Sequence, residues 1–305
     1  MTLHGTAIDP HRFGSTPTVV LLPMTSPIST QENALSRSPQ LTIRDVLRAR
    51  QTISRWLDPT PTRTYDALDR WSGLRLVLKH EHWCPTGQFK IRGSLNLLSA
   101  LQGQGVRAVC TASTGNLGLG IAGAAQLVGL RAVICVPEGA NAQKVAAIES
   151  YGAQIITHGK DFDEAREWIA SQAARLETTF VATTAPEMIT GNGTLTLELL
   201  LEHPDVDAII VPVGGGSCVC GAAIAAKAID PAIAVIGVQS AQAPAMQKAW
   251  ATGDMSSDRC ATYAEGIATR VPFPNAIQIM RRLLDDFVLV DDREILDAQA
   301  HIWQL

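Results

Sequence analysis

A lysine that could act as a nucleophile lies in the segment Pro85-Thr-Gly-Gln-Phe-Lys-Ile-Arg-Gly93. Lys90 directly follows Phe89, where a Pro/Gly turn gives way to a helical pattern. The positive end of a helix dipole disfavours an ammonium ion, so a lysine at a helix start gives up its proton more readily than one on the surface. Such a neutral amine could attack a carbonyl group. Because most lysines are solvated surface charges, this interpretation depends on partners elsewhere in the chain.

Three successive glycines follow an apolar strand pattern over 208–213 and precede a helical pattern over 219–228, in Gly214-Gly-Gly-Ser-Cys218. Glycine adopts positive φ easily and lets the backbone come close to a ligand. Free N–H groups at the start of the following helix bind anions such as phosphate, and Ser217 adds a hydroxyl donor. The loop lacks the GK[ST] ending of a Walker A motif and the GxGxxG spacing. An ordinary tight turn between strand and helix remains the alternative.

A second loop between a strand pattern and a helical pattern reads Ala112-Ser-Thr-Gly-Asn-Leu117. The hydroxyls of Ser113 and Thr114, with N–H groups at the helix start, suit a carboxylate, although these residue types also favour an ordinary helix cap. A phosphate site, a carboxylate site and an amine nucleophile fit one cofactor in particular. Pyridoxal phosphate carries one phosphate and one aldehyde and acts on amino acids.

The motifs resemble those of the fold-type II pyridoxal-phosphate enzymes, the tryptophan synthase β superfamily. Within that group they are most similar to the threonine/serine dehydratase and serine racemase branch. Segment 85–93 resembles its PTGSFKxRG lysine motif, and Ser113-Thr-Gly-Asn116 resembles its S-[ST]-G-N loop. Segment 214–218 resembles its phosphate loop, and Glu265-Gly-Ile-Ala268 resembles the DGxA segment beside the cofactor ring. The resemblance extends from about Leu41 to the last residue.

The resemblance implies a role for each motif. Lys90 would bind pyridoxal phosphate covalently and later take the Cα proton of the substrate. The ring would contact Phe89, Asn116 and Gly266. The phosphate would be bound by Gly214, Gly215, Gly216, Ser217 and Cys218, and the substrate carboxylate by Ser113, Thr114, Gly115, Asn116 and Leu117. The expected reaction is β-elimination from a hydroxy-amino acid such as L-threonine or L-serine, which gives a 2-oxo acid and ammonia.

Several positions depart from the family pattern. Thr114 stands where serine racemases carry the serine that works on the second face of the substrate, so Thr114 is a candidate catalytic residue but racemisation is less favoured. Leu117 replaces a usual histidine. Gln239 and Ala245 stand where serine racemase holds a divalent cation with carboxylates. Calcium and magnesium prefer carboxylates, so we predict no such metal.

Short apolar strand patterns alternate with helical patterns from Leu41 onward. This alternation predicts an α/β fold with parallel sheets, and the resemblance implies two lobes, each with a mostly parallel sheet and helices on both faces. We expect a loose N-terminal extension over 1–40, a large cofactor domain from 41–107 and 185–305, and a small substrate-loop domain over 108–184. The family's last strand and helices would follow Leu305, so we expect a C-terminally truncated copy, with a rebuilt C-terminus as the alternative. Met24 is an alternative start.

Composition excludes two classes of partner. Lys and Arg number 25 against 29 Asp and Glu, giving a net charge of −4, which offers no electrostatic basis for binding nucleic acid or an anionic membrane. The apolar runs are too short for a bilayer span. Six cysteines without disulfide or zinc spacing indicate a reducing cytoplasm. We therefore expect a small amino-acid substrate, and the resemblance implies a homo-oligomer, a dimer or a tetramer.

Other functions stay open at this level. The STGN loop also occurs in threonine synthases, although their lysine motif usually has an acidic residue where this chain has Ile91. Dehydration of a hydroxyectoine-derived or 3-hydroxyaspartate-type compound is a further enzymatic alternative. An alternative of another class is a non-catalytic fragment that binds pyridoxal phosphate, and the presence of Lys90 argues against it.

Overall fold

The computed structural model describes residues 40–303, so the predictions for the N-terminal extension and for Met24 lie outside the described residues. The first helix, α1 (Ile43–Ile53), begins with a capping box in which the Thr42 N–H donates to the Asp45 carboxylate at 2.9 Å. This pairing satisfies backbone donors that the first turn leaves free. No helix within residues 40–303 is long and apolar enough to cross a membrane.

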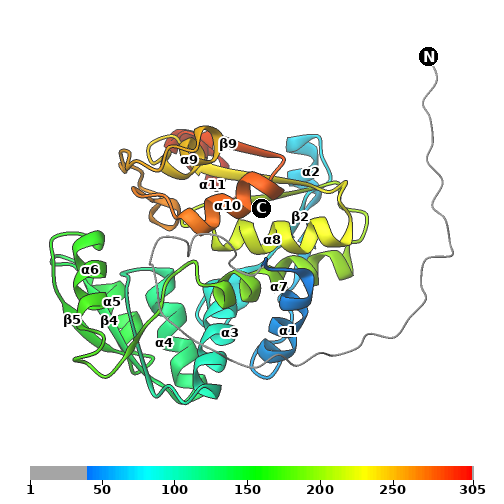
Figure 1. Ribbon diagram of the computed structural model, residues 1–305. Coiled ribbons are helices and arrows are strands. Elements are labelled where there is room, and N and C mark those ends of the chain that lie inside the picture. The colour runs from blue at the N-terminus through cyan, green and yellow to red at the C-terminus, as the bar shows by residue number, and fades with distance from the viewer. Residues whose placement is uncertain (1–39, 304–305) are drawn as a thin grey trace, which may run out of the picture. The chain divides into compact units, whose positions relative to one another are not determined.

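One parallel sheet has the strand order β5-β4-β3-β6. Its two central strands are almost entirely buried, as expected for strands covered on both faces. Figure 1 shows the connecting helices gathered around these strands. The elements are β3 (Ala108–Ala112), α4 (Asn116–Val128), β4 (Arg131–Val136), α5 (Ala142–Glu149), β5 (Gln154–Thr157), α6 (Phe162–Gln172) and β6 (Thr179–Phe180).

A second parallel sheet has the order β7-β8-β9, and a short antiparallel hairpin pairs β1 with β2. The sheet and its helices comprise β7 (Ala208–Pro212), α8 (Ser217–Ile229), β8 (Ala234–Ser240), α9 (Ala245–Thr252), α10 (Pro274–Leu283), β9 (Asp286–Val290) and α11 (Asp292–Trp303). The hairpin region comprises β1 (Thr62–Thr64), α2 (Asp66–Ser72), β2 (Val77–Lys79) and the 3₁₀ turn η1 (Glu81–Trp83). A second 3₁₀ turn is η2 (Glu265–Ile267).

Two interior helices connect these parts. Helix α3 (Lys90–Gly103) packs against α4 and α7 (Pro186–Glu202), and α7 also packs against α8. One apolar cluster is built mainly from α7, β7, α8 and α10, and another mainly from α1, α3, α4 and β4. Because α7 touches both α3 and α8, it fixes the start of the lysine helix relative to the start of the helix that follows the glycine loop.

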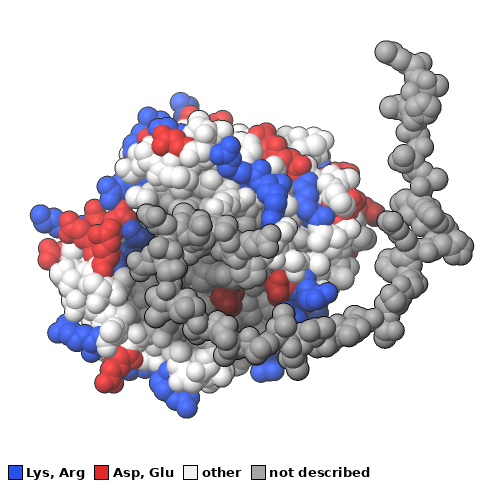
Figure 2. Space-filling view, viewed as in Figure 1, with Lys and Arg blue, Asp and Glu red and all other residues white. Residues whose placement is uncertain are grey.

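The predicted α/β fold with two parallel sheets is confirmed. All strands of the first sheet come from 108–184 and all strands of the second from 185–305. The domain boundaries themselves stay a prediction. On the face in Figure 2, basic and acidic side chains are interspersed over the described surface.

Candidate functional site

Lys90 is the first residue of α3, and Phe89 is the residue that caps this helix. The backbone N–H of Lys90 donates to Gln88 Oε1 at 2.6 Å, and Gln88 Nε2 donates to Thr86 Oγ1 at 2.9 Å. These bonds satisfy a donor that the helix start leaves free. The Lys90 amine lies 5.5 Å from the centroid of the Phe89 ring. The turn before α3 therefore holds the lysine at a fixed position.

The Lys90 amine points toward residues from two other elements. Its Nζ donates to Ser217 Oγ at 2.9 Å and to Thr183 Oγ1 at 3.0 Å. Burial lowers the pKa of Lys90 to about 8, because a charged ammonium loses hydration there. A fraction of the amine is therefore neutral near physiological pH, and the cause is burial, whereas the sequence argument relied on the helix dipole.

The glycine loop meets the start of α8. Gly216 adopts φ +91 and caps the helix, a conformation that favours glycine. A Cβ at Gly214 would lie 2.7 Å from the Gly266 carbonyl oxygen, so the two backbones touch. Burial raises the pKa of the Cys218 thiol to about 12, so this group stays neutral beside Lys90. The loop thus places Ser217 at the start of α8, beside the Lys90 amine.

The Ser113–Leu117 loop includes Gly115, the residue that caps α4, and the first two residues of that helix. Ser113 Oγ accepts from the Gly115 N–H at 3.1 Å, so this hydroxyl folds back on its own loop. Asn116 is exposed, and a Cβ at Gly266 would lie 4.0 Å from its amide nitrogen. The structure thus brings Asn116, Gly266 and the glycine loop together. Thr114 and Leu117 are half-buried in the same loop, and no hydrogen bond joins Thr114 to Lys90 in the described part of the chain.

The segment that carries Gly266 is tied to the helices of the first sheet by ion pairs. Glu265 pairs with Lys144 of α5, and Arg270 pairs with Asp163 of α6 at 2.6 Å. One partner of each pair is exposed, so each pair contributes little by itself. Both pairs join the segment around Gly266 to helices that connect strands of the first sheet.

Sequence reasoning missed three polar residues at the site. Thr183 receives a hydrogen bond from Lys90, and Gln88 receives one from its backbone. Asn192 of α7 donates to Ser217 Oγ at 3.2 Å. The available signals were weak: Thr183 follows the carboxyl end of a two-residue strand, and Asn192 lies in the segment Gly191-Asn-Gly-Thr194.

The two positions that replace metal ligands are buried. Gln239 Oε1 accepts from the Gln247 backbone N–H at 3.1 Å, and Ala245 begins α9. Within residues 40–303 there is no group of three or more His, Cys, Asp or Glu side chains that could hold a metal ion.

The site fits the two reactive ends of pyridoxal phosphate. The phosphate needs N–H donors at a helix start, and the glycine loop ends at the start of α8, which Gly216 caps. The aldehyde needs an amine that can give up its proton, and burial lowers the pKa of Lys90 to about 8. The hydrogen bond between Lys90 and Ser217 joins both features in one place.

Two curated proteins are similar to this chain in sequence. The chain is 34% identical over 261 residues to an L-threonine ammonia-lyase of Thermotoga maritima, covering 85% of this chain and 65% of that protein. It is 33% identical over 267 residues to the catabolic L-threonine dehydratase of Escherichia coli K12, covering 86% of this chain and 80% of that protein. The chain thus spans just under two thirds of the Thermotoga relative.

Solved structures share the fold. The processed form of threonine deaminase isoform 2 from Solanum lycopersicum matches with a TM-score of 0.81 at 27% identity, covering 86% of this chain and 77% of that one. Maize serine racemase matches with a TM-score of 0.81 at 31% identity, covering 87% of this chain and 81% of that one. The family described as pyridoxal-phosphate dependent enzyme matches residues 53–305. This chain therefore belongs to the pyridoxal-phosphate-dependent enzymes, in the fold-type II group that includes threonine dehydratases.

Proposed function

We propose that the protein is a pyridoxal-phosphate-dependent lyase, similar to the threonine/serine ammonia-lyases, that converts a hydroxy-amino acid such as L-threonine or L-serine to a 2-oxo acid and ammonia. The observation that carries this proposal is the Lys90 amine, which donates to Ser217 of the glycine loop at 2.9 Å. The names of the relatives, L-threonine ammonia-lyase and L-threonine dehydratase, support the same substrate class.

Each motif has a proposed binding role. Residues 214–218 hold the cofactor phosphate, and Phe89, Asn116 and Gly266 hold its ring. The Ser113–Leu117 loop binds the substrate carboxylate through its N–H groups at the start of α4. When bound, pyridoxal phosphate supplies an electron sink for the charge that develops at the substrate Cα.

Lys90 moves protons in this proposal. With substrate bound, the free Lys90 Nζ would take the Cα proton and return it to the β-hydroxyl, which would leave as water. The unsaturated amine that is released hydrolyses to a 2-oxo acid and ammonia, so one water is lost and one is regained. Thr114, half-buried in the carboxylate loop, is the second candidate catalytic group.

A substrate panel tests this proposal. The purified chain with pyridoxal phosphate is given L-threonine, L-serine, 3-hydroxyaspartate and O-phosphohomoserine in separate reactions, and ammonia and 2-oxo acid are measured. We expect equal amounts of both products from L-threonine or L-serine. Threonine formation from O-phosphohomoserine, or turnover of 3-hydroxyaspartate alone, would replace the proposed substrate class. A chain that binds the cofactor and turns over none of the four would be a non-catalytic binding protein.

The lowered pKa of Lys90 gives a pH prediction. A pKa of about 8 leaves about a tenth of the amine neutral at pH 7. Covalent capture of added cofactor by the cofactor-free protein should therefore speed up as pH rises through about 8 and then level off. Stopped-flow absorbance measures this rate, and a rate that climbs without levelling up to pH 10 would contradict the shift.

The same shift links pH to stability. The folded chain loses the lysine proton near pH 8, whereas the unfolded chain keeps it up to about 10.5. Since the unfolded state then binds more protons, Lys90 makes the cofactor-free protein more stable as pH rises between these values.

Replacing Gly214 with alanine should weaken cofactor binding. The new Cβ would lie 2.7 Å from the Gly266 carbonyl oxygen, so one backbone must move. We expect the dissociation constant for pyridoxal phosphate to rise at least about tenfold, because displacements of about an ångström at a site can cost up to about 10²-fold. Gly103→Ala is the matched control, since a Cβ there meets no atom within 4 Å. Equal affinity in both variants would show that Gly214 does not contact the bound phosphate.

Three broader assignments are also proposals. We infer a cytoplasmic location, supported by six free cysteine thiols. We infer a dimer or tetramer, which sedimentation equilibrium measures directly. We keep the division into a large domain (41–107 and 185–305) and a small domain (108–184), supported by the separate sheets within those ranges.

A further inference from the structure

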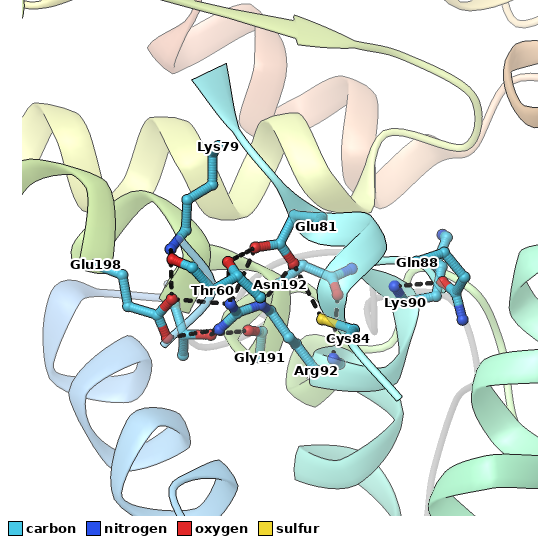
Figure 3. A network of polar contacts seen from close by, with 12 residues as sticks. Thr60, Lys79, Glu81, Cys84, Gln88, Lys90, Arg92, Gly191, Asn192 and Glu198 are labelled. Carbon is cyan, nitrogen blue, oxygen red and sulfur yellow. Dashed lines mark hydrogen bonds and ion pairs between the residues drawn. The ribbon is translucent and has the colours of Figure 1, made fainter. Parts of the chain in front are cut away.

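Asn192 is a buried amide that bonds to two different elements. It lies on α7, next to Gly191, with no exposed surface (Figure 3). Its Oδ1 accepts from the Gly93 backbone N–H of α3 at 3.1 Å. Its Nδ2 donates to Ser217 Oγ, at the start of α8, at 3.2 Å. One side chain therefore links the lysine helix to the glycine loop.

The packing around Asn192 fixes its orientation. A Cβ at Gly191 would lie 2.7 Å from Gly93 Cα, and a Cβ at Gly193 would lie 2.8 Å from the Gly221 carbonyl oxygen. The backbone of α7 thus touches α3 on one side of Asn192 and α8 on the other. Because a buried amide is costly unless both ends are bonded, these contacts hold the amide nitrogen toward Ser217.

The two hydrogen bonds that Ser217 Oγ accepts determine in which direction its own proton can donate. Ser217 Oγ accepts from Lys90 Nζ at 2.9 Å and from Asn192 Nδ2 at 3.2 Å. A hydroxyl has two acceptor lone pairs and one donor proton, so both lone pairs are used. Among residues 40–303 no acceptor takes the remaining proton. That proton is free to donate to an anion at the start of α8, where the helix dipole also favours negative charge.

We infer that Asn192 is a positioning residue: it fixes the Ser217 hydroxyl as a donor to the bound phosphate and holds the glycine loop at a set distance from Lys90. This inference rests on the proposed function, since it takes the glycine loop to be the cofactor phosphate site. Among residues 40–303 no hydrogen bond joins Asn192 to Lys90 Nζ, and its amide nitrogen donates to Ser217 Oγ, so in this inference it acts through Ser217.

The test compares cofactor affinity with fold stability. Asn192→Ala and Ser217→Ala are each titrated with pyridoxal phosphate and with inorganic phosphate, and their melting temperatures are recorded. We expect each variant to bind both ligands about tenfold more weakly, the size of one charge-assisted hydrogen bond. The double variant should be no weaker than Ser217→Ala, because both changes remove the same donor.

A matched control separates positioning from packing. Asn96 is a buried asparagine in the same interface of α3 and α7, and its Nδ2 donates to the Glu187 carbonyl oxygen at 2.8 Å. Asn96→Ala should lower the melting temperature without changing either affinity. If Asn192→Ala behaves like Asn96→Ala, the inference is overturned while the proposed function stands.

Three further outcomes are decisive. Should Asn192→Ala fail to fold, Ser217→Ala still decides, since it leaves α7 unchanged; undiminished affinity in that variant overturns the inference. If the unaltered chain binds no pyridoxal phosphate, the proposed function fails instead. Additive losses in the double variant would show that Asn192 acts independently of Ser217, which also contradicts the inference.

Discussion

Lys90→Ala is expected to remove covalent cofactor attachment and to lower turnover at least about 10³-fold, the scale on which a positioned proton-transfer group contributes. The Lys90 amine bonds to Ser217 and Thr183, so it stands at the glycine loop. Alanine removes both the nucleophile and the base. Borohydride reduction of the loaded protein, followed by peptide mapping, should place the cofactor on Lys90 in the unaltered chain and nowhere in the variant.

Lys248→Ala is the control for this experiment. Lys248 lies on α9, where it is half-buried and pairs with Asp258 at 3.3 Å. It should retain full attachment and turnover. Cofactor found on another lysine in the unaltered chain, or turnover that persists in Lys90→Ala, would contradict the role of Lys90 as the cofactor-binding and proton-transferring residue.

Arg92→Ala is expected to destabilise the fold by about 3–5 kcal/mol, the cost of breaking a buried ion pair. Arg92 is fully buried and binds Glu81 (Nε–Oε2 2.7 Å) and Glu198 (Nη1–Oε1 2.6 Å), as Figure 3 shows. Lys79 pairs with Glu198 at 2.8 Å, so two cations balance two carboxylates. Without Arg92, one buried negative charge has no partner. Urea unfolding measures the loss.

The surface arginine Arg48 provides the comparison. It pairs with Asp45 at 3.5 Å with 69% of its side chain exposed, so Arg48→Ala should cost under about 1 kcal/mol. Arg92→Lys keeps the charge but not the planar fork, so its loss should fall between the two. Equal stability of Arg92→Ala and Arg48→Ala would mean that the cluster contributes no net stability.

The ion pairs of Arg92 and Lys79 with Glu198 also determine how the stability of the fold changes at low pH. Burial alone would raise the pKa of Glu198, but hydrogen bonds from Arg92 and Lys79 outweigh it and lower the pKa. This contribution is present above the ordinary value of 4.5 and is lost as pH falls through the lowered value.

Local patterns predicted the parts of the site that depend on neighbouring residues. A Pro/Gly turn before an apolar helix placed Lys90 at a helix start, and three glycines between a strand and a helix placed the loop at the start of α8. The alternation of strands and helices was enough to predict parallel sheets. These features depend on residues that are close together in the sequence, where turn residues and apolar periodicity are informative.

Contacts between distant residues could not be predicted in the same way. Lys90 and Thr183 are 93 positions apart, and β6, which precedes Thr183, has two residues. Such a short strand has no period to detect. Asn192 lies in a helix whose buried glycines and polar residues hide the usual apolar stripe. Its role depends on the packing of three helices, which is set by tertiary structure.

The visible absorption spectrum of the purified chain with pyridoxal phosphate, recorded before and after L-threonine, tests the central claim most directly. The account predicts a protein-bound cofactor band that survives dialysis, is absent in Lys90→Ala, and changes on addition of L-threonine while ammonia is released. A spectrum identical to that of free pyridoxal phosphate, or a bound band that neither L-threonine nor L-serine alters, would contradict the assignment of this chain as a hydroxy-amino-acid lyase.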